Sequence, residues 1–135
     1  MSLAPLFAAS PVIQIHAFAA MAAFVVGLVQ FAAPKGTAPH RALGWVFVVV
    51  MAAVALSSFF IHTIRSFGPF SLIHLLSILT LIALPLAVLR AHRHQVAAHR
   101  RMMTALFLGA LVIAGIFTLL PGRIMHAVIF ETAAP

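Results

Sequence analysis

The sequence contains no cysteine and only one acidic residue, Glu131, among its 135 residues. Without a thiol there can be no disulfide, thiolate metal site, iron–sulfur cluster or cysteine nucleophile. Because the apolar segments hold no carboxylate, calcium and magnesium lack their preferred ligands, and no acid can orient a histidine beside a serine for hydrolysis. Gly-rich nucleotide-binding loops are also absent. These absences leave open whether the protein is an enzyme.

Charge of either sign is scarce, with 7% charged and 64% hydrophobic residues and a mean hydropathy of +1.21. A soluble domain is about a quarter charged and about half apolar, so this composition predicts an integral membrane protein. The eight Lys and Arg residues lie in short segments between apolar runs, which is typical of membrane orientation rather than of nucleic-acid binding. We therefore expect the lipid bilayer as a partner, and no nucleic acid.

Four apolar runs are each close to the ~20 residues that a helix needs to cross the hydrocarbon core. They cover about residues 11–33, 42–64, 70–90 and 102–120, and a short apolar tail follows at 124–130. The alternation typical of membrane β-strands is missing, and helices otherwise satisfy the backbone in lipid. No linker or repeat divides the chain. The prediction is one all-α transmembrane domain, residues 1–135, folded as a four-helix bundle.

The positions of the cations predict the orientation of this bundle. Six of them fall in the loops opposite the N-terminus, and only Arg65 and Arg123 fall on the N-terminal side. Because short cytoplasmic loops are enriched in Lys and Arg, both termini are expected outside. The first run is interpreted as a retained helix, since no cation precedes it and it exceeds the roughly 7–15 residues of a signal-peptide core.

The predicted topology divides the eight histidines into two groups. The inner group lies beside loops among arginines, where interfacial anchoring or attraction to anionic lipid is usual; it comprises His40, His92, His94 and His99. The outer group lies within or near the spans, where an ionisable side chain is costly and marks a candidate functional site; it comprises His16, His62, His74 and His126.

His16 and His74 are expected to lie deepest. His16 should lie about one and a half helical turns inside its helix, and His74 a little over one turn. From His16, small or polar residues recur at helical spacing as far as Gln30. Such a stripe allows close helix contact, so His16 should point into the bundle. Taken alone, such a stripe indicates only that two helices pack together. Imidazoles from several helices at one level favour a cofactor or an ion.

Three hypotheses follow for the function. The first is a membrane redox (electron-transfer) protein that binds one b-type haem, or a quinone, in its outer half. Histidines facing each other across a bundle suit haem, and the two outer arginines could pair with its propionates. The cofactor-binding residues would then be His16, His74, His62, His126, Arg65 and Arg123.

The second hypothesis is transition-metal binding or transport by the same four histidines, because imidazoles with Met125 nearby suit copper, zinc or iron. The third is a non-catalytic accessory subunit of a membrane complex, in which the histidines form hydrogen bonds between helices. Since four short helices make a thin bundle, a homo-oligomer or a larger membrane redox complex is expected.

Four motifs occur in a characteristic order: HRxxGW at 40–45, GPFSxIHLL at 68–76, HRRxM at 99–103 and AGxFTLLPGRIMH at 114–126. In this combination the chain resembles a bacterial family of predicted four-helix inner-membrane proteins with a domain of unknown function. The resemblance implies a multi-pass fold in the bacterial inner (cytoplasmic) membrane. It does not imply any particular activity. The chain is more remotely similar to cytochrome b561-like bundles, although its histidine spacings depart from their two-haem pattern. Because two motifs contain His40 and His99, a cytoplasmic-side site built from both is a further alternative.

Overall fold

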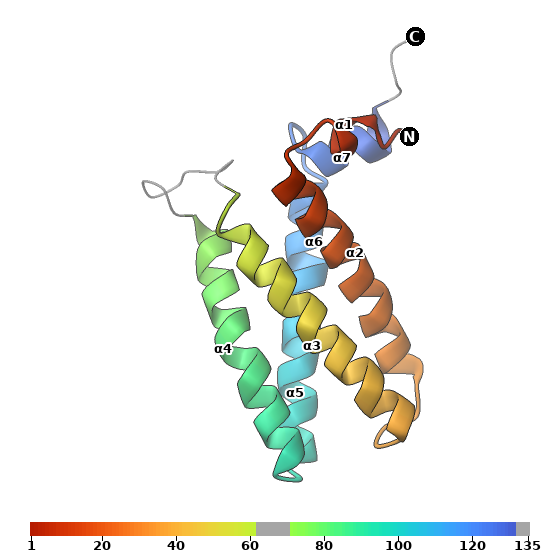
Figure 1. Ribbon diagram of the computed structural model, residues 1–135, viewed down its shortest axis with the longest axis vertical. Helices are drawn as coiled ribbons and strands as arrows, with labels where there is room; N and C mark the ends of the chain where they lie inside the picture. Colours follow the sequence, from red (N-terminus) through yellow and green to blue (C-terminus); the bar gives the residue numbers. More distant parts are fainter. Residues whose placement is uncertain (62–70, 132–135) are drawn as a thin grey trace.

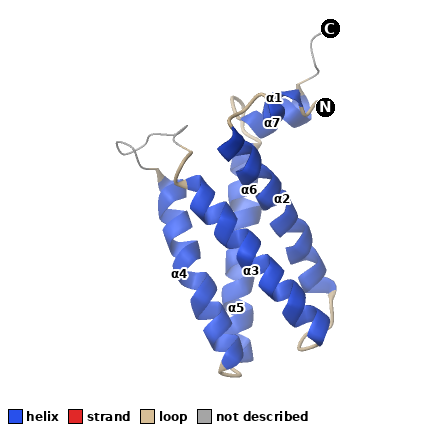
Figure 2. Cartoon of the chain, viewed as in Figure 1, coloured by secondary structure: helices blue, strands red, loops and turns tan. Residues whose placement is uncertain are grey.

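The structure, a computed structural model, describes residues 1–61 and 71–131, and this part of the chain consists of helices and turns without a strand (Figures 1 and 2). Within these residues, four helical stretches are long and apolar enough to cross a membrane, which confirms the predicted all-α fold. They are α2 (Pro11–Ala32), α3 (Ala38–Ser58), α4 (Leu72–His92) and a continuous stretch of α5 (Val96–Leu106), the π-helix η1 (Phe107–Ile113) and α6 (Ala114–Thr118).

Two short helices lie side by side across the end of the bundle that also holds the N-terminus (Figure 1). They are α1 (Ala4–Phe7) and α7 (Ile124–Phe130), and α7 occupies the residues predicted as an apolar tail. The backbone N–H of Ser2 donates to the carbonyl of Val128 at 3.0 Å, and Leu6 is fully buried. We call this end the outer end, and the end with the α2–α3 and α4–α5 turns the inner end. That the outer end faces away from the cytoplasm stays a prediction.

The spans start or end several residues away from the limits of the apolar runs. The second span begins at Ala38 rather than 42, because the Thr37 side chain accepts from the backbone N–H of His40 at 3.3 Å and caps the helix. The fourth span begins at Val96 rather than 102, and α4 continues to His92 rather than 90. Hydropathy marks the lipid-embedded part, whereas helix caps lie in the polar layer beyond it. The α3 helix ends at Ser58, and the predicted residues 62–64 and 70 lie outside the described residues.

The buried core joins α2, α3, α4 and the last span through apolar side chains. Gly27 of α2 packs directly against the Phe107 ring of η1, and a Cβ atom at Gly27 would clash with that ring. Phe24 stacks on Phe107 with ring centroids 5.5 Å apart, and Phe31 meets it edge-on at 5.0 Å. Glycine at this position therefore sets how closely α2 approaches the last span.

Most large apolar side chains outside this core are exposed in the isolated chain, as expected for surfaces that contact lipid. Only 11% of the most apolar window of α2 is buried inside the protein. The chain therefore has a narrow core and a wide lipid-facing surface.

Candidate functional site

His16 of α2 lies against the outer half of α3. Its Nδ1 atom is 3.0 Å from the carbonyl oxygen of Val54 and 2.9 Å from the hydroxyl of Ser57. A carbonyl oxygen only accepts, so Nδ1 carries the hydrogen and donates it, and Nε2 keeps its lone pair. The predicted inward orientation of His16 is confirmed, and its hydrogen bonds join α2 to α3.

His74 has the opposite hydrogen-bond arrangement in the first turn of α4. It is 2% exposed, and its Nδ1 atom accepts from the backbone N–H of Ser71 at 3.1 Å and lies 3.1 Å from the Ser71 hydroxyl. Because a backbone N–H only donates, Nδ1 of the neutral ring carries the lone pair and Nε2 the hydrogen. The ring also contacts Phe59, with centroids 5.8 Å apart. His74 therefore helps to cap α4 and fixes its start against the end of α3.

Two serine hydroxyls form the polar contact between α3 and α4 in the same region. Ser58 and Ser77 are hydrogen-bonded to each other and are 2% and 6% exposed. Because Ser57 is bonded to His16 and Ser58 to Ser77, neighbouring residues of α3 bind two different helices. These side chains form a polar layer that connects α2, α3 and α4.

His126 lies apart from this layer, on α7. Its Nδ1 atom is 2.7 Å from the carbonyl oxygen of Leu119, just after α6, and its ring is 4.9 Å from that of Phe130. Arg123 is the residue that precedes α7. The hydrogen bond between His126 and Leu119 holds α7 folded back onto the end of the last span.

The predicted outer site is thus seen only in part. His62 and Arg65 lie outside the described residues. The hydrogen bonds given above for His16, His74 and His126 lead to three different partners. Within residues 1–61 and 71–131, no three His or acidic side chains are grouped closely enough to hold a metal ion. Convergence of the outer histidines on one cofactor stays a prediction.

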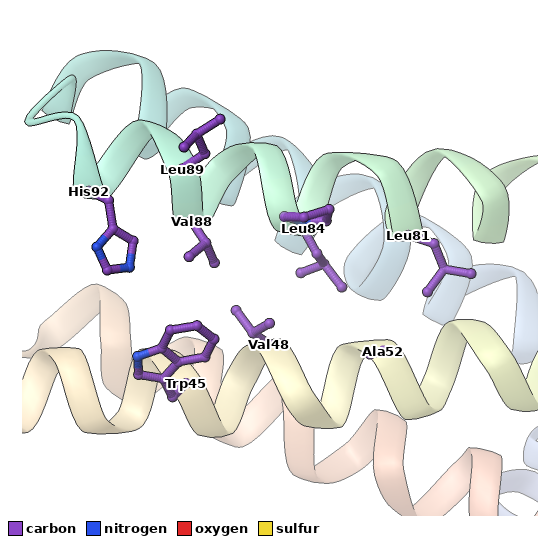
Figure 3. A pocket seen from close by; sticks show the side chains of 9 residues that line it. Trp45, Val48, Ala52, Leu81, Leu84, Val88, Leu89 and His92 are labelled. Atoms are coloured by element: carbon purple, nitrogen blue, oxygen red, sulfur yellow. The ribbon is translucent and has the colours of Figure 1, made fainter.

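An apolar groove of about 440 Å³ lies between α3 and α4 towards the inner end (Figure 3). Its volume is within the range of about 300–1,000 Å³ typical of small-molecule sites. None of its lining residues carries a fixed charge; they are Trp45, Val48, Ala52, Leu81, Leu84, Pro85, Val88, Leu89 and His92. Figure 3 shows Val48 and Val88 pointing towards each other across the groove. The walls are therefore aliphatic over most of their length.

Two aromatic rings with polar nitrogen atoms close one end of this groove. The indole of Trp45 and the imidazole of His92 face each other, with ring centroids 6.5 Å apart (Figure 3). Pro85 lies further along the wall. Because proline has no N–H, Pro85 cannot donate the usual helical hydrogen bond to the carbonyl of Leu81. The groove thus combines hydrogen-bonding groups at one end with an apolar channel.

Residues 13–133 match a family described as "Predicted membrane protein (DUF2306)". The chain belongs to this family. No curated protein and no solved structure matches it. The match confirms the predicted membership of a membrane family with a domain of unknown function, whereas similarity to cytochrome b561-like bundles stays a prediction. The family description names no activity, so the function of this DUF2306 protein has to be inferred from its residues.

Sequence reasoning missed the groove of this DUF2306 protein and assigned His92 to interfacial anchoring. A helical pattern could have indicated it, because residues 45, 48 and 52 share one face of α3, and residues 81, 85, 88 and 92 share one face of α4. That these two faces oppose each other depends on helix packing, which the pattern alone does not give.

Proposed function

We propose that this chain is a membrane redox protein that binds a prenylated quinone in the groove between α3 and α4. The observation that carries the proposal is the aliphatic groove that ends at Trp45 and His92. A prenylated quinone has a long apolar tail and a flat ring with two carbonyl oxygens. The channel suits the tail, while the indole and imidazole N–H groups can donate to the carbonyls and the indole can stack on the ring.

The neutrality of the groove favours a quinone over a phospholipid. A phosphate group is usually bound by Arg or Lys, and the lining residues include neither. Arg90 is the nearest cation before His92 on α4, and its guanidinium donates to the side chain of Gln95 after the helix. Arg93 directly follows His92, but neither arginine is among the residues that line the groove.

The presence of histidine at this end supports a redox use of the groove. Imidazole takes up and releases protons near neutral pH, and a reduced quinone carries protons on its ring oxygens. His92 is exposed at the end of α4, so its ring can contact both water and the head group.

The single tryptophan of the chain makes the proposal directly testable, because Trp45 is at the site. We expect a decyl-substituted benzoquinone to quench the fluorescence of the purified protein saturably in detergent. Ala52→Phe should abolish saturation by filling the groove. His92→Ala should weaken binding about threefold to tenfold, as for the loss of one hydrogen bond. His94→Asn, in the adjacent turn, is the matched control.

Two outcomes would overturn this proposal. One is quenching that does not saturate, or that saturates equally in the Ala52→Phe protein. The other is displacement of the quinone by phosphatidylglycerol at equal concentration, which would identify the groove as a phospholipid site. Extraction of the purified protein and analysis of its bound lipids distinguishes the two occupants independently.

A b-type haem or a quinone in the outer half stays a prediction, and the outer histidines fit a haem unequally. His16 suits a ligand role, since its Nδ1–H is held by Val54 and Ser57 and Nε2 is the lone-pair atom. His74 would have to change tautomer and give up its bond from the Ser71 backbone. The His16→Ala protein should lack the Soret band of a haem-loaded wild type. A wild type that stays colourless after haem supplementation rejects this version.

Metal transport by the outer histidines and a role as an accessory subunit also stay predictions. Elemental analysis of purified protein tests the first, since it requires stoichiometric copper, zinc or iron that is lost on substitution of His16. Native purification in mild detergent tests the second and the expected homo-oligomer, through the mass of the complex and any co-purifying subunits.

A further inference from the structure

At the inner end, α2, α3 and α5 each carry a polar side chain that the proposed quinone site does not use. Gln30 lies near the end of α2, and its Nε2 atom donates to the backbone carbonyl of His40 in the first turn of α3 at 2.9 Å. Gly44, one turn further along α3, leaves room for this amide, since a Cβ there would lie 3.2 Å from the Gln30 Nε2 atom. The Gln30 amide is therefore held against the start of α3.

Two polar atoms of this cluster are buried without a hydrogen-bond partner in the part of the chain that the structure describes. They are Oε1 of Gln30 and Nδ1 of His40. Buried polar atoms nearly always have a partner in proteins, and an exception calls for an explanation such as an ion or a bound molecule. The two atoms belong to residues that are joined by the hydrogen bond from the Gln30 amide to the His40 backbone.

His99 of α5 supplies a third polar atom. Its Nδ1 donates to the carbonyl oxygen of Ala87 on α4 at 2.8 Å, so its Nε2 atom carries the lone pair. His99 is also near enough to His40 for the two rings to interact electrostatically. The hydrogen bond to the backbone is the arrangement that fixes the tautomer and orientation of many metal-binding histidines.

The two fixed positive charges that act on His40 are directed into the turn between α2 and α3. Lys35 and Arg41 both act electrostatically on His40. The Lys35 ammonium, however, donates to the carbonyl of Phe31 at 2.7 Å, and the Arg41 guanidinium donates to the carbonyl of Gly36 at 2.8 Å. These cations are anchored to backbone oxygens and do not fill the place beside Gln30.

We propose that Gln30, His40 and His99 form a site for a transition-metal ion such as Zn²⁺. Two imidazole nitrogens and an amide oxygen suit zinc, copper or nickel, whereas calcium and magnesium require more oxygen ligands. Three protein ligands leave the fourth position of a tetrahedral ion open to water. The HRxxGW and HRRxM motifs each contribute one of the two histidines.

The site is tested by titrating metal-free, full-length protein in detergent with Zn²⁺, followed by calorimetry and elemental analysis. We expect one ion per chain, and at least a tenfold weaker affinity in the His40→Ala protein. The decisive variant is His99→Asn, because the Asn amide nitrogen can replace Nδ1 and keep the hydrogen bond to Ala87 while Nε2 is lost. A merely structural role of His99 predicts unchanged affinity, whereas the metal site predicts at least a tenfold loss.

The matched control is His94→Asn, because His94 lies in the α4–α5 turn with a φ of 56°, a conformation that Asn tolerates. This protein should bind Zn²⁺ as the wild type does. Co²⁺ provides a second readout, since its visible absorption reports the ligands and should disappear in the His40→Ala protein. Sub-stoichiometric binding, or equal weakening in all three histidine variants, overturns the proposal. Quinone quenching of Trp45 does not involve these residues, so either result can fail without the other.

Discussion

The outer and inner ends of the bundle differ in how their polar side chains are satisfied. At the outer end, His16, His74 and the serines at 57, 58, 71 and 77 bond to one another or to backbone groups across α2, α3 and α4. At the inner end, the Gln30 and His40 side chains keep buried atoms without a partner in the described part of the chain. The hydrogen bonds of the outer layer join the helices to one another, whereas the inner cluster is where we propose that a metal ion binds.

The largest effect is expected from His74→Leu, which tests the structural side of this comparison. The substitution removes the side chain that accepts from Ser71 and places an apolar group beside the polar start of α4. We expect a loss of about 2–3 kcal/mol in the free energy of unfolding. Unfolding in mixed micelles measures it. If the stability were unchanged while a bound ligand was lost, the outer end would be a binding site instead.

A loss of about 1–3 kcal/mol is expected from Gly27→Ala, between the two ends, because the added methyl group overlaps the Phe107 ring. This variant sharpens the comparison, since it disturbs apolar packing and leaves both polar regions intact. Gly115→Ala, at a position where a Cβ meets nothing within 4 Å, is the control. Thermal unfolding should separate the two, and equal melting temperatures would contradict the close approach of α2 to η1.

A loss of about 1 kcal/mol is expected from His16→Ala, which removes the hydrogen bonds between α2 and α3. Hydrogen bonds between membrane helices average roughly 0.6 kcal/mol, and the lost packing of the ring adds to this value. The measurement is again unfolding in mixed micelles. If the substitution lowered the free energy of unfolding by more than about 3 kcal/mol, and only when the wild type was loaded with haem, His16 would act through a cofactor.

The smallest effect is expected from His40→Ala in metal-free protein, where the change in stability should stay within about 0.5 kcal/mol. The Nδ1 atom of His40 has no described hydrogen bond to lose, while the carbonyl that Gln30 binds belongs to the backbone and is retained. Zinc should stabilise the wild type and leave this variant unchanged. A large loss without metal would place His40 among the structural histidines and remove the contrast between the two ends.

The sequence predicted the fold well, because hydropathy alone locates four membrane-crossing segments. The small and polar stripe on α2 also predicted that His16 faces the bundle, as its contact with Val54 confirms. The start of α3 was missed since the Thr37 cap lies outside the apolar run. Hydropathy reports burial in lipid and is insensitive to the polar residues that begin and end a helix.

The candidate sites were less accessible to sequence reasoning. The tautomer of His74 is set by the hydrogen bond from the Ser71 backbone. Because the two residues are three positions apart, the sequence could have indicated that they cap α4. The Trp45–His92 pair, by contrast, depends on which helices are neighbours. One sequence contains no direct information on helix order, so side chains on separate spans could be grouped by depth but not by contact.

The π-helix in the last span has a consequence for changes in chain length. A stretch of wide turns accommodates an extra residue without rotating the helices before and after it. Deleting one residue between Phe107 and Ile113 should therefore shorten η1 to ordinary α-helix while the flanking segments keep their faces towards lipid and core. The same deletion within α2, which has no such stretch, would turn every later side chain of that helix by about 100°. The last span is thus a part of this protein where the deletion of one residue can be absorbed locally.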